Sequence, residues 1–351
     1  MGGGYREHWL DLAKAIGIIL VVWAHALPKD NYMWIWINSF HMPLFFCISG
    51  YLYSCKGGFL PYAVKKIRTL WVPFEVASFV TYIVFLLIGT QASFSVKEIA
   101  KIVLMVAPGP LLGATWFIPV LLFTSILYDL LYRGIRRVGK EKNSVFILTV
   151  VSIIFLIVGL ITSLPYRGSV ILRSVFFFHL GQMMKKYWKS QKYDLVIGIV
   201  LMAAVSVAAI FNTTSYLNNT FTSLPLYFVA AIGGSIGICI LCRFVCSHID
   251  AEKMKGILYI GMNTMGPLIW QFVTFKIVIA LQIIVYHLPW SRLEDFPVIY
   301  DYATGLWVLL DIVVGIGISI MIYKLVNKPV DKLAARAEKR LLGGLPKKVV
   351  C

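Results

Sequence analysis

The stretch LDLAKAIGIILVVWAHAL, residues 10–27, is long and hydrophobic enough to span a bilayer, yet Lys14 and His25 stand within it. The two residues are eleven positions apart, about three helical turns, so their side chains share one helix face with Asp11 at different depths. The next hydrophobic segment, FHMPLFFCISGY at 40–51, brings a third ionisable group, His41. Ionisable side chains inside membrane segments usually mark a functional site, so the sequence predicts a polar path across the membrane.

The composition supports the membrane assignment. Of the 351 residues, 59% are hydrophobic and only 14% are charged, which is more apolar than a soluble domain of this length. Short loops rich in Pro, Gly, Lys and Arg separate the hydrophobic runs. We therefore predict an all-α polytopic membrane protein with about ten transmembrane helices. Their expected spans are 10–27, 32–54, 71–90, 113–132, 145–164, 169–186, 194–212, 223–246, 263–287 and 303–326.

Lys and Arg residues set the expected orientation, because they are enriched in cytoplasmic loops. With the N-terminus inside, most of the 33 lie on the cytoplasmic side. Both termini are then cytoplasmic, with a transmembrane domain over 1–330 and a basic tail over 331–351. The net charge of +17 follows from this topology, and we expect no nucleic-acid binding because the basic residues form no contiguous domain. The basic residues expected outside are Lys29, Lys97, Lys101, Arg167 and Arg292.

Each polar residue also has a purely structural interpretation. A lysine at the centre of a membrane helix costs about 2.5–3.5 kcal/mol, but Lys14 lies near the inner end and can extend to the interface. His25 alone is compatible with a hydrogen-bonded packing residue. His41 strengthens the functional interpretation, because two imidazoles near one cavity are suited to proton transfer at neutral pH. Ser49 offers a hydroxyl group, although its place beside Gly50 equally indicates close helix packing.

The first two helices carry a resemblance to a known family. The spacing of Lys14 and His25, with ten residues between them, resembles a pattern of the membrane-bound acyltransferase 3 family. That family has Arg or Lys, then ten residues, then His, and it includes bacterial sugar O-acetyltransferases. FHMPLFFCISGYLY at 40–53 is similar to the signature of its second helix. One departure is Gln271 in GMNTMGPLIWQF, where many members have His. A further match is a basic pair, Lys65 and Arg68, followed by Trp71 and Pro73. The pair Trp116 and Phe117 is similar to a Trp-Phe pair of the family.

The resemblance implies a multi-pass O-acyltransferase of the bacterial cytoplasmic membrane. Such an enzyme moves an acyl group, most often acetyl, from cytoplasmic acyl-CoA to a hydroxyl of an envelope sugar or polysaccharide, and needs no metal. In this interpretation His25 is the general base, His41 positions a reactant or stabilises the oxyanion, and Lys14 lies along the path of the pantetheine arm. A covalent acyl-histidine is the variant mechanism. We assign binding of the acyl-CoA phosphates to Lys65, Lys66 and Arg68. We assign other substrate contacts to Ser49 and Trp116.

Two other functions remain open from the residues. Succinyl or another short acyl group is an alternative to acetyl. A transporter, such as a flippase for lipid-linked sugars, also has many helices with intramembrane charge, although the chain shows no internal repeat. Release of CoA thiol distinguishes the enzyme from the transporter. The CxxC of Cys239 and Cys242 has no second ligand cluster, so we interpret these cysteines as small buried hydrophobic residues.

Overall fold

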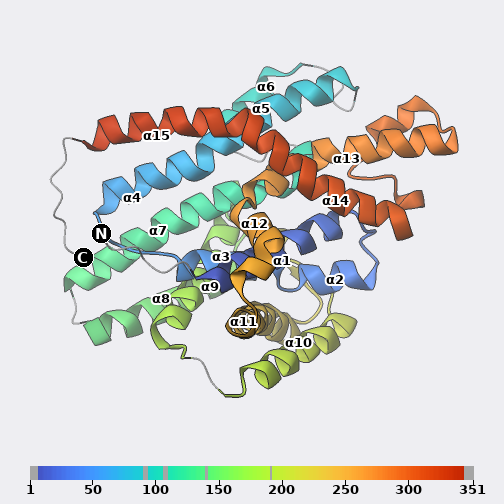
Figure 1. Cartoon of the computed structure of the whole chain (residues 1–351). Coiled ribbons are helices and arrows are strands. Elements are labelled where there is room, and N and C mark those ends of the chain that lie inside the picture. The colour runs from blue at the N-terminus through green and yellow to red at the C-terminus, as the bar shows by residue number, and fades with distance from the viewer. Residues whose placement is uncertain (1–6, 90–93, 106–109, 139–140, 190–191, 344–351) are drawn as a thin grey trace.

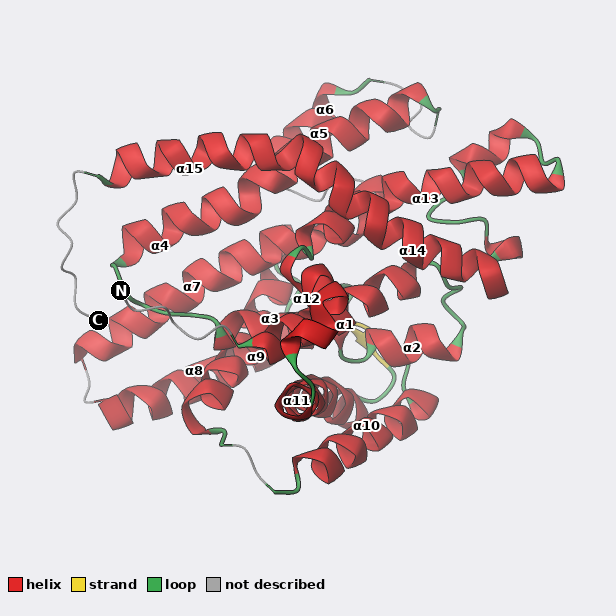
Figure 2. Cartoon of the chain, viewed as in Figure 1, coloured by secondary structure: helices red, strands yellow, loops and turns green. Residues whose placement is uncertain are grey.

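Helices make up nearly all of the chain that the computed structural model describes, which is residues 7–89, 94–105, 110–138, 141–189 and 192–343 (Figures 1 and 2). A short antiparallel ribbon, β1 (Thr214–Ser215) with β2 (Thr220–Phe221), lies between α10 and α11. The helices are α1 (His8–His25), α2 (Tyr32–Asn38), α3 (His41–Tyr51), α4 (Phe59–Lys66), α5 (Val72–Leu87), α6 (Val96–Val103), α7 (Phe117–Val138), α8 (Glu141–Ile161), α9 (Gly168–Tyr187), α10 (Asp194–Phe211), α11 (Leu224–His248), α12 (Lys255–Met262), α13 (Met265–Tyr286), α14 (Gly305–Ile322) and α15 (Lys328–Leu342).

The prediction of a helical membrane protein is confirmed, and the exact number of crossings stays a prediction. Within the described residues, eight helices are long and apolar enough to cross a membrane. Outward faces of α8 and α10 expose apolar side chains such as Ile157 and Val200, as expected for a surface covered by lipid. The two expected spans outside this group are 32–54 and 169–186, and each has a physical reason. The cytoplasmic location of both termini stays a prediction.

The expected span 32–54 is broken into α2 and α3. The chain leaves the helical conformation at Phe40, where φ is −142°, and the Ser39 hydroxyl donates to the Trp36 carbonyl. Pro43 then occupies the first turn of α3, where a missing backbone N–H costs little because no partner lies upstream. The break leaves α3 only 11 residues long and places His41 at its beginning, inside the protein.

The other expected span, 169–186, is α9, which is 20 residues long but too polar to meet the apolar criterion. It lies within the bundle against α3, α7 and α8, where Arg173 and His179 are buried. Glycines allow α3 and α9 to pack backbone against backbone. A Cβ atom on Gly50 would lie 1.8 Å from the Phe178 carbonyl oxygen, and one on Gly181 would lie 1.9 Å from the Cys47 carbonyl oxygen.

Two pairs of consecutive helices are each joined by a π-helical turn. α4 continues into α5 through Ile67–Trp71, and α14 continues into α15 through Tyr323–Asn327. A proline follows each turn, Pro73 and Pro329, and the missing N–H of proline loosens the preceding helical ladder. The Asn327 side chain donates to the Pro73 carbonyl at 3.0 Å, so the turns are in contact. As a result α15, which includes most of the expected tail, lies along α4 and α5 (Figure 1).

Candidate active site

His25 and His41 line one cavity of about 760 Å³, which we call the outer cavity because it lies on the predicted outer side. His25 is the last residue of α1 and His41 the first residue of α3, so the break between α2 and α3 brings them to the same space. The cavity has the size of a typical small-molecule site. Its other lining residues are Ala24, Pro28, Lys29, Trp34, Asn38, Gly113, Phe272, Phe296, Pro297 and Tyr300.

Gln271 of α13 holds the ring of His25. Its Oε1 lies 3.2 Å from His25 Nδ1, and its Nε2 donates to the Leu268 carbonyl at 3.4 Å, which supports this orientation of the amide. The His25 Nδ1–H is therefore the donor, and Nε2 of the neutral ring carries a free lone pair. Phe272 packs edge-on against the imidazole, with ring centroids 5.0 Å apart. The ring is fixed in the tautomer that a general base needs.

A backbone carbonyl fixes His41 in the same tautomer. Its Nδ1 lies 2.8 Å from the carbonyl oxygen of Ile37, which can only accept, so Nδ1 carries the proton. Nε2 of neutral His41 is then an acceptor as well. Both rings thus offer an unprotonated nitrogen, and the carbonyl that orients His41 belongs to the last turn of α2.

Lys14 and Ser49 line a second, smaller cavity of about 110 Å³, which we call the inner cavity. Lys14 forms an ion pair with Asp11, with Nζ and Oδ1 2.6 Å apart. Residues of α1, α3, α7 and α13 complete the wall: Ile18, Met42, Phe45, Ile48, Leu52, Phe117, Leu121, Thr264, Met265 and Leu268. Lys14 and His25 therefore line two separate cavities along one helix, where the sequence predicts one continuous polar path.

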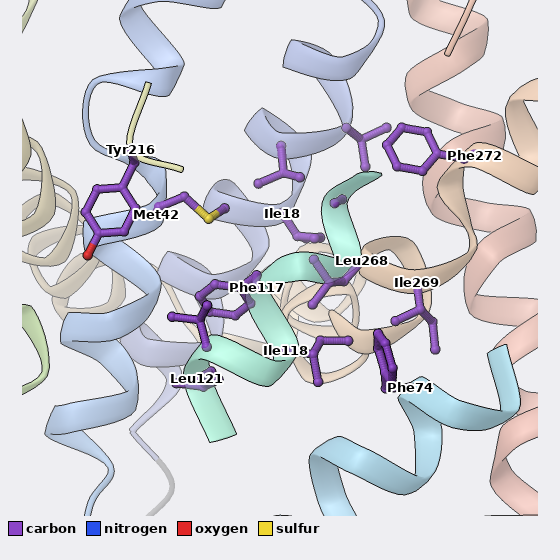
Figure 3. Packing of buried hydrophobic residues seen from close by; sticks show 14 of the residues in the cluster. Ile18, Met42, Phe74, Phe117, Ile118, Leu121, Tyr216, Leu268, Ile269 and Phe272 are labelled. Carbon is purple, nitrogen blue, oxygen red and sulfur yellow. The ribbon is translucent and has the colours of Figure 1, made fainter. Parts of the chain in front are cut away.

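An apolar layer separates the two cavities. Ile18, Met42 and Leu268 belong to one buried cluster that also includes Phe117 and Phe272 (Figure 3). Met42 directly follows His41 in α3, and Leu268 precedes Gln271 by one helical turn in α13. Side chains of this cluster adjoin both cavities: Ile18, Met42 and Leu268 line the inner one, and Phe272 lines the outer one.

The three basic residues assigned to acyl-CoA line neither cavity. Lys65 is exposed on α4, and the Lys66 ammonium lies 5.5 Å from the centre of the Tyr62 ring. Arg68 forms an ion pair with Glu338 of α15. The guanidinium expected to meet a phosphate is therefore bound to a carboxylate from the C-terminal helix.

Ser49 and Trp116, both assigned to substrate binding, lie in different places. Ser49 faces the inner cavity, whereas Trp116 lines neither the inner nor the outer one. The Trp116 ring stacks on Tyr216, with centroids 6.4 Å apart, and lies 5.9 Å from the Arg167 guanidinium carbon. Arg167 belongs to the loop between α8 and α9, so Trp116 connects the bundle to the predicted outer surface.

Sequence reasoning missed the partner of His25. Gln271 stood out only as a departure from the family pattern, and the structure shows that this position contacts His25 from 246 residues away. Cys239 and Cys242 are buried free thiols. Within the described part of the chain, no group of three or more His, Cys, Asp or Glu side chains is arranged to hold a metal ion.

Comparison with protein-family models matched one family over most of the chain. The acyltransferase 3 model, described as an acyltransferase domain, spans residues 7–328. The match includes both histidines, Lys14, Gln271 and the basic residues of α4, and it ends at the first residue of α15. No curated protein and no solved structure matched the chain.

Proposed function

The chain belongs to the acyltransferase 3 family, and from this premise we propose that it transfers a short acyl group from acyl-CoA to a hydroxyl of an envelope sugar or polysaccharide. Acetyl is our first candidate for the acyl group, and the bacterial cytoplasmic membrane is the proposed location. One observation supports the proposal: His25 and His41 line one cavity large enough for a sugar, and Gln271 and the Ile37 carbonyl engage the Nδ1 atoms, which leaves each Nε2 for a substrate.

In the proposed reaction, His25 Nε2 removes the proton of the acceptor hydroxyl. The acceptor oxygen then attacks the thioester carbonyl carbon, and an ester C–O bond forms as the C–S bond breaks. The CoA thiolate leaves and takes the proton from the His25 imidazolium, which returns the ring to its neutral form. Gln271 keeps this ring in the correct tautomer throughout.

His41 is better suited to position the acceptor than to stabilise an oxyanion. Its Nδ1–H is engaged by the Ile37 carbonyl, so neutral His41 has no N–H to direct at a developing negative charge. Its Nε2 lone pair can accept a hydrogen bond from an acceptor hydroxyl. We therefore propose that His41 orients the sugar while His25 removes the proton. Acylation of His25 Nε2 itself is the covalent variant of the same geometry.

The donor is proposed to enter from the inner side. The inner cavity of about 110 Å³ corresponds to about four water volumes, which favours a short acyl group over a fatty acyl chain. Lys14 is already paired with Asp11, so the carboxylate of a succinyl group would compete with Asp11 there, and this favours acetyl over succinyl. The CoA phosphates would meet Lys65, Lys66 and Arg68 after Glu338 moves aside.

The acceptor is proposed to bind in the outer cavity. Aromatic rings of Trp34, Phe296 and Tyr300 line it and provide apolar faces against which a sugar ring can pack. Asn38 adds an amide that can bind sugar hydroxyls. A glycan or a lipid-linked sugar at the membrane surface fits this mixture of aromatic and polar groups.

The proposal is tested on cells lacking the gene, complemented with wild type or His25→Ala at matched membrane levels. We expect wild type to restore alkali-labile esters on envelope glycans and His25→Ala not to, and mass spectrometry of the released acid identifies the acyl group. Purified wild-type protein should also release CoA thiol from acetyl-CoA. Absence of both esters and thiol release would refute the enzyme and favour a transporter, and full activity of His25→Ala would refute the general base.

A further inference from the structure

A third cavity, of about 460 Å³, opens beside the loop between α8 and α9. Arg167 is the only charged residue among the described residues that line it. The rest of the wall is apolar or aromatic, from α7, α9 and the end of α6: Leu104, Met105, Pro119, Val120, Phe123, Tyr166 and Ile171. We call this space the Arg167 cavity.

The Arg167 guanidinium contacts the Trp116 ring but has a nitrogen without a hydrogen-bond acceptor. Its Nη1 is buried without a hydrogen bond, and it forms no ion pair within the described residues. Burial lowers the pKa of Arg167 to about 10, because desolvation disfavours the charged form and no nearby acid offsets it. A buried cationic donor without an acceptor is costly, which indicates that a ligand supplies the acceptor.

The local backbone holds Arg167 in place. Tyr166 and Arg167 have φ values of 53° and 61°, in the left-handed region that non-glycine residues rarely adopt. The Ser169 hydroxyl braces the turn by donating to the Thr162 carbonyl at 2.6 Å and accepting from the Leu164 N–H at 2.7 Å. The Trp116 ring supports the guanidinium from one side, 5.9 Å away.

The basic residues of the predicted outer side differ in whether they are ion-paired. Arg292 binds Asp295 and Asp301, and Lys101 binds Glu98. Lys29 and Arg167, in contrast, form no ion pair within the described residues, and each lines a cavity without Asp or Glu among its described lining residues. Lys97 also forms no ion pair within the described residues, but it is exposed and lines neither cavity, and Lys29 is exposed as well. Arg167 differs from both because its Nη1 is buried, so its cavity favours a negative ligand.

We propose that the Arg167 cavity binds a phosphate or carboxylate group of the acceptor, so that the acceptor is an anionic glycan or lipid-linked glycan. This rests on the proposed function. Gly113 lines the outer cavity, and Val120, seven residues further along the same segment, lines the Arg167 cavity. In this proposal an extended acceptor places a hydroxyl at His25 and its anionic group at Arg167, whose guanidinium suits two-point binding of such oxygens.

The test measures anion binding by the full-length protein in phosphatidylcholine nanodiscs, titrated with inorganic phosphate and with glucuronate. We expect Arg167→Gln to weaken binding about tenfold or more, and Arg167→Lys to retain part of it. Arg292→Gln is the matched control, since that arginine is on the same predicted side but already paired. Unchanged binding by Arg167→Gln, or an equal loss in Arg292→Gln, overturns the proposal.

A second arm distinguishes the two sources of the anion. Nanodiscs containing phosphatidylglycerol compete with glucuronate only if the cavity also accepts a lipid headgroup, which indicates a lipid-linked acceptor. Glucuronate binding that phosphatidylglycerol leaves unchanged indicates an acidic sugar. If lipid binds but neither soluble anion does, the site is a structural lipid site and the proposal fails. Thiol release from acetyl-CoA is measured on wild type in parallel, so failure of the proposed enzyme is recognised separately from failure of the anion site.

Discussion

Gln271 provides the sharpest test of the catalytic geometry. Gln271→Met keeps the volume of the side chain but removes the oxygen that accepts from His25 Nδ1. Gln271 is 0% exposed, so water cannot readily replace the lost acceptor. Only the Val21 backbone then remains as a hydrogen-bond partner of His25, so the ring more readily adopts the tautomer with the proton on Nε2, which cannot act as a base.

The expected size of the effect follows from the lost hydrogen bond. Leaving a buried donor without an acceptor costs about 1–3 kcal/mol. At about 1.36 kcal/mol per tenfold, kcat should fall about 5- to 160-fold. The KM for acyl-CoA should remain near the wild-type value, because Gln271 is absent from the described lining of the inner cavity. Gln271→His should retain most of the activity, since a ring nitrogen can accept the same bond.

The assay is steady-state release of CoA thiol by protein in nanodiscs, with acetyl-CoA and acceptor varied separately. Gln282→Met is the matched control, because Gln282 is a buried glutamine three turns further along α13. A Gln271→Met variant whose kcat stays within about twofold of wild type would refute the tautomer argument. An equal loss in Gln282→Met would show that the effect is a general disturbance of α13.

Three further predictions concern the donor site, the packing and the second histidine. Glu338→Gln should lower the KM for acyl-CoA up to about fivefold, because it frees Arg68 from its ion pair. The control Glu252→Gln, which breaks the exposed ion pair with Lys255, should leave this KM unchanged in the same assay. Gly181→Ala should destabilise the protein by about 1–3 kcal/mol in thermal unfolding, and Gly317→Ala, with nothing within 4 Å, should not. His41→Gln should retain more activity than His41→Asn. The reason is that the Gln side-chain oxygen can replace Nε2 as the acceptor, whereas the shorter Asn side chain reaches only the position of Nδ1. Equal loss of activity in both variants would contradict the positioning role.

The helical membrane class was predictable from the sequence because it depends on local properties. Runs of apolar residues and their lengths determine which segments can span a bilayer. The common face of Lys14 and His25 follows from helical periodicity alone. The number of crossings stays a prediction, but two expected spans differ from simple apolar helices: the segment 32–54 breaks at Phe40, and α9 carries buried polar residues inside the bundle.

The roles of particular side chains depended on contacts between distant segments. Gln271 meets His25 across 246 residues, and Glu338 meets Arg68 across 270. Trp116, assigned to substrate binding from its motif, packs between Arg167 and Tyr216, and its role in binding stays a prediction.

The sequence by itself therefore determined the membrane class, the helical fold and the face on which Lys14 and His25 lie. The tertiary structure decided which tautomer the histidines adopt, how the inner and outer cavities are separated, and which cations stay unpaired. The physical reason is that helix formation and membrane insertion depend on residues close in the chain. Hydrogen-bond partners, cavities and ion pairs depend instead on which helices pack together, and that packing brings together residues that no local pattern relates.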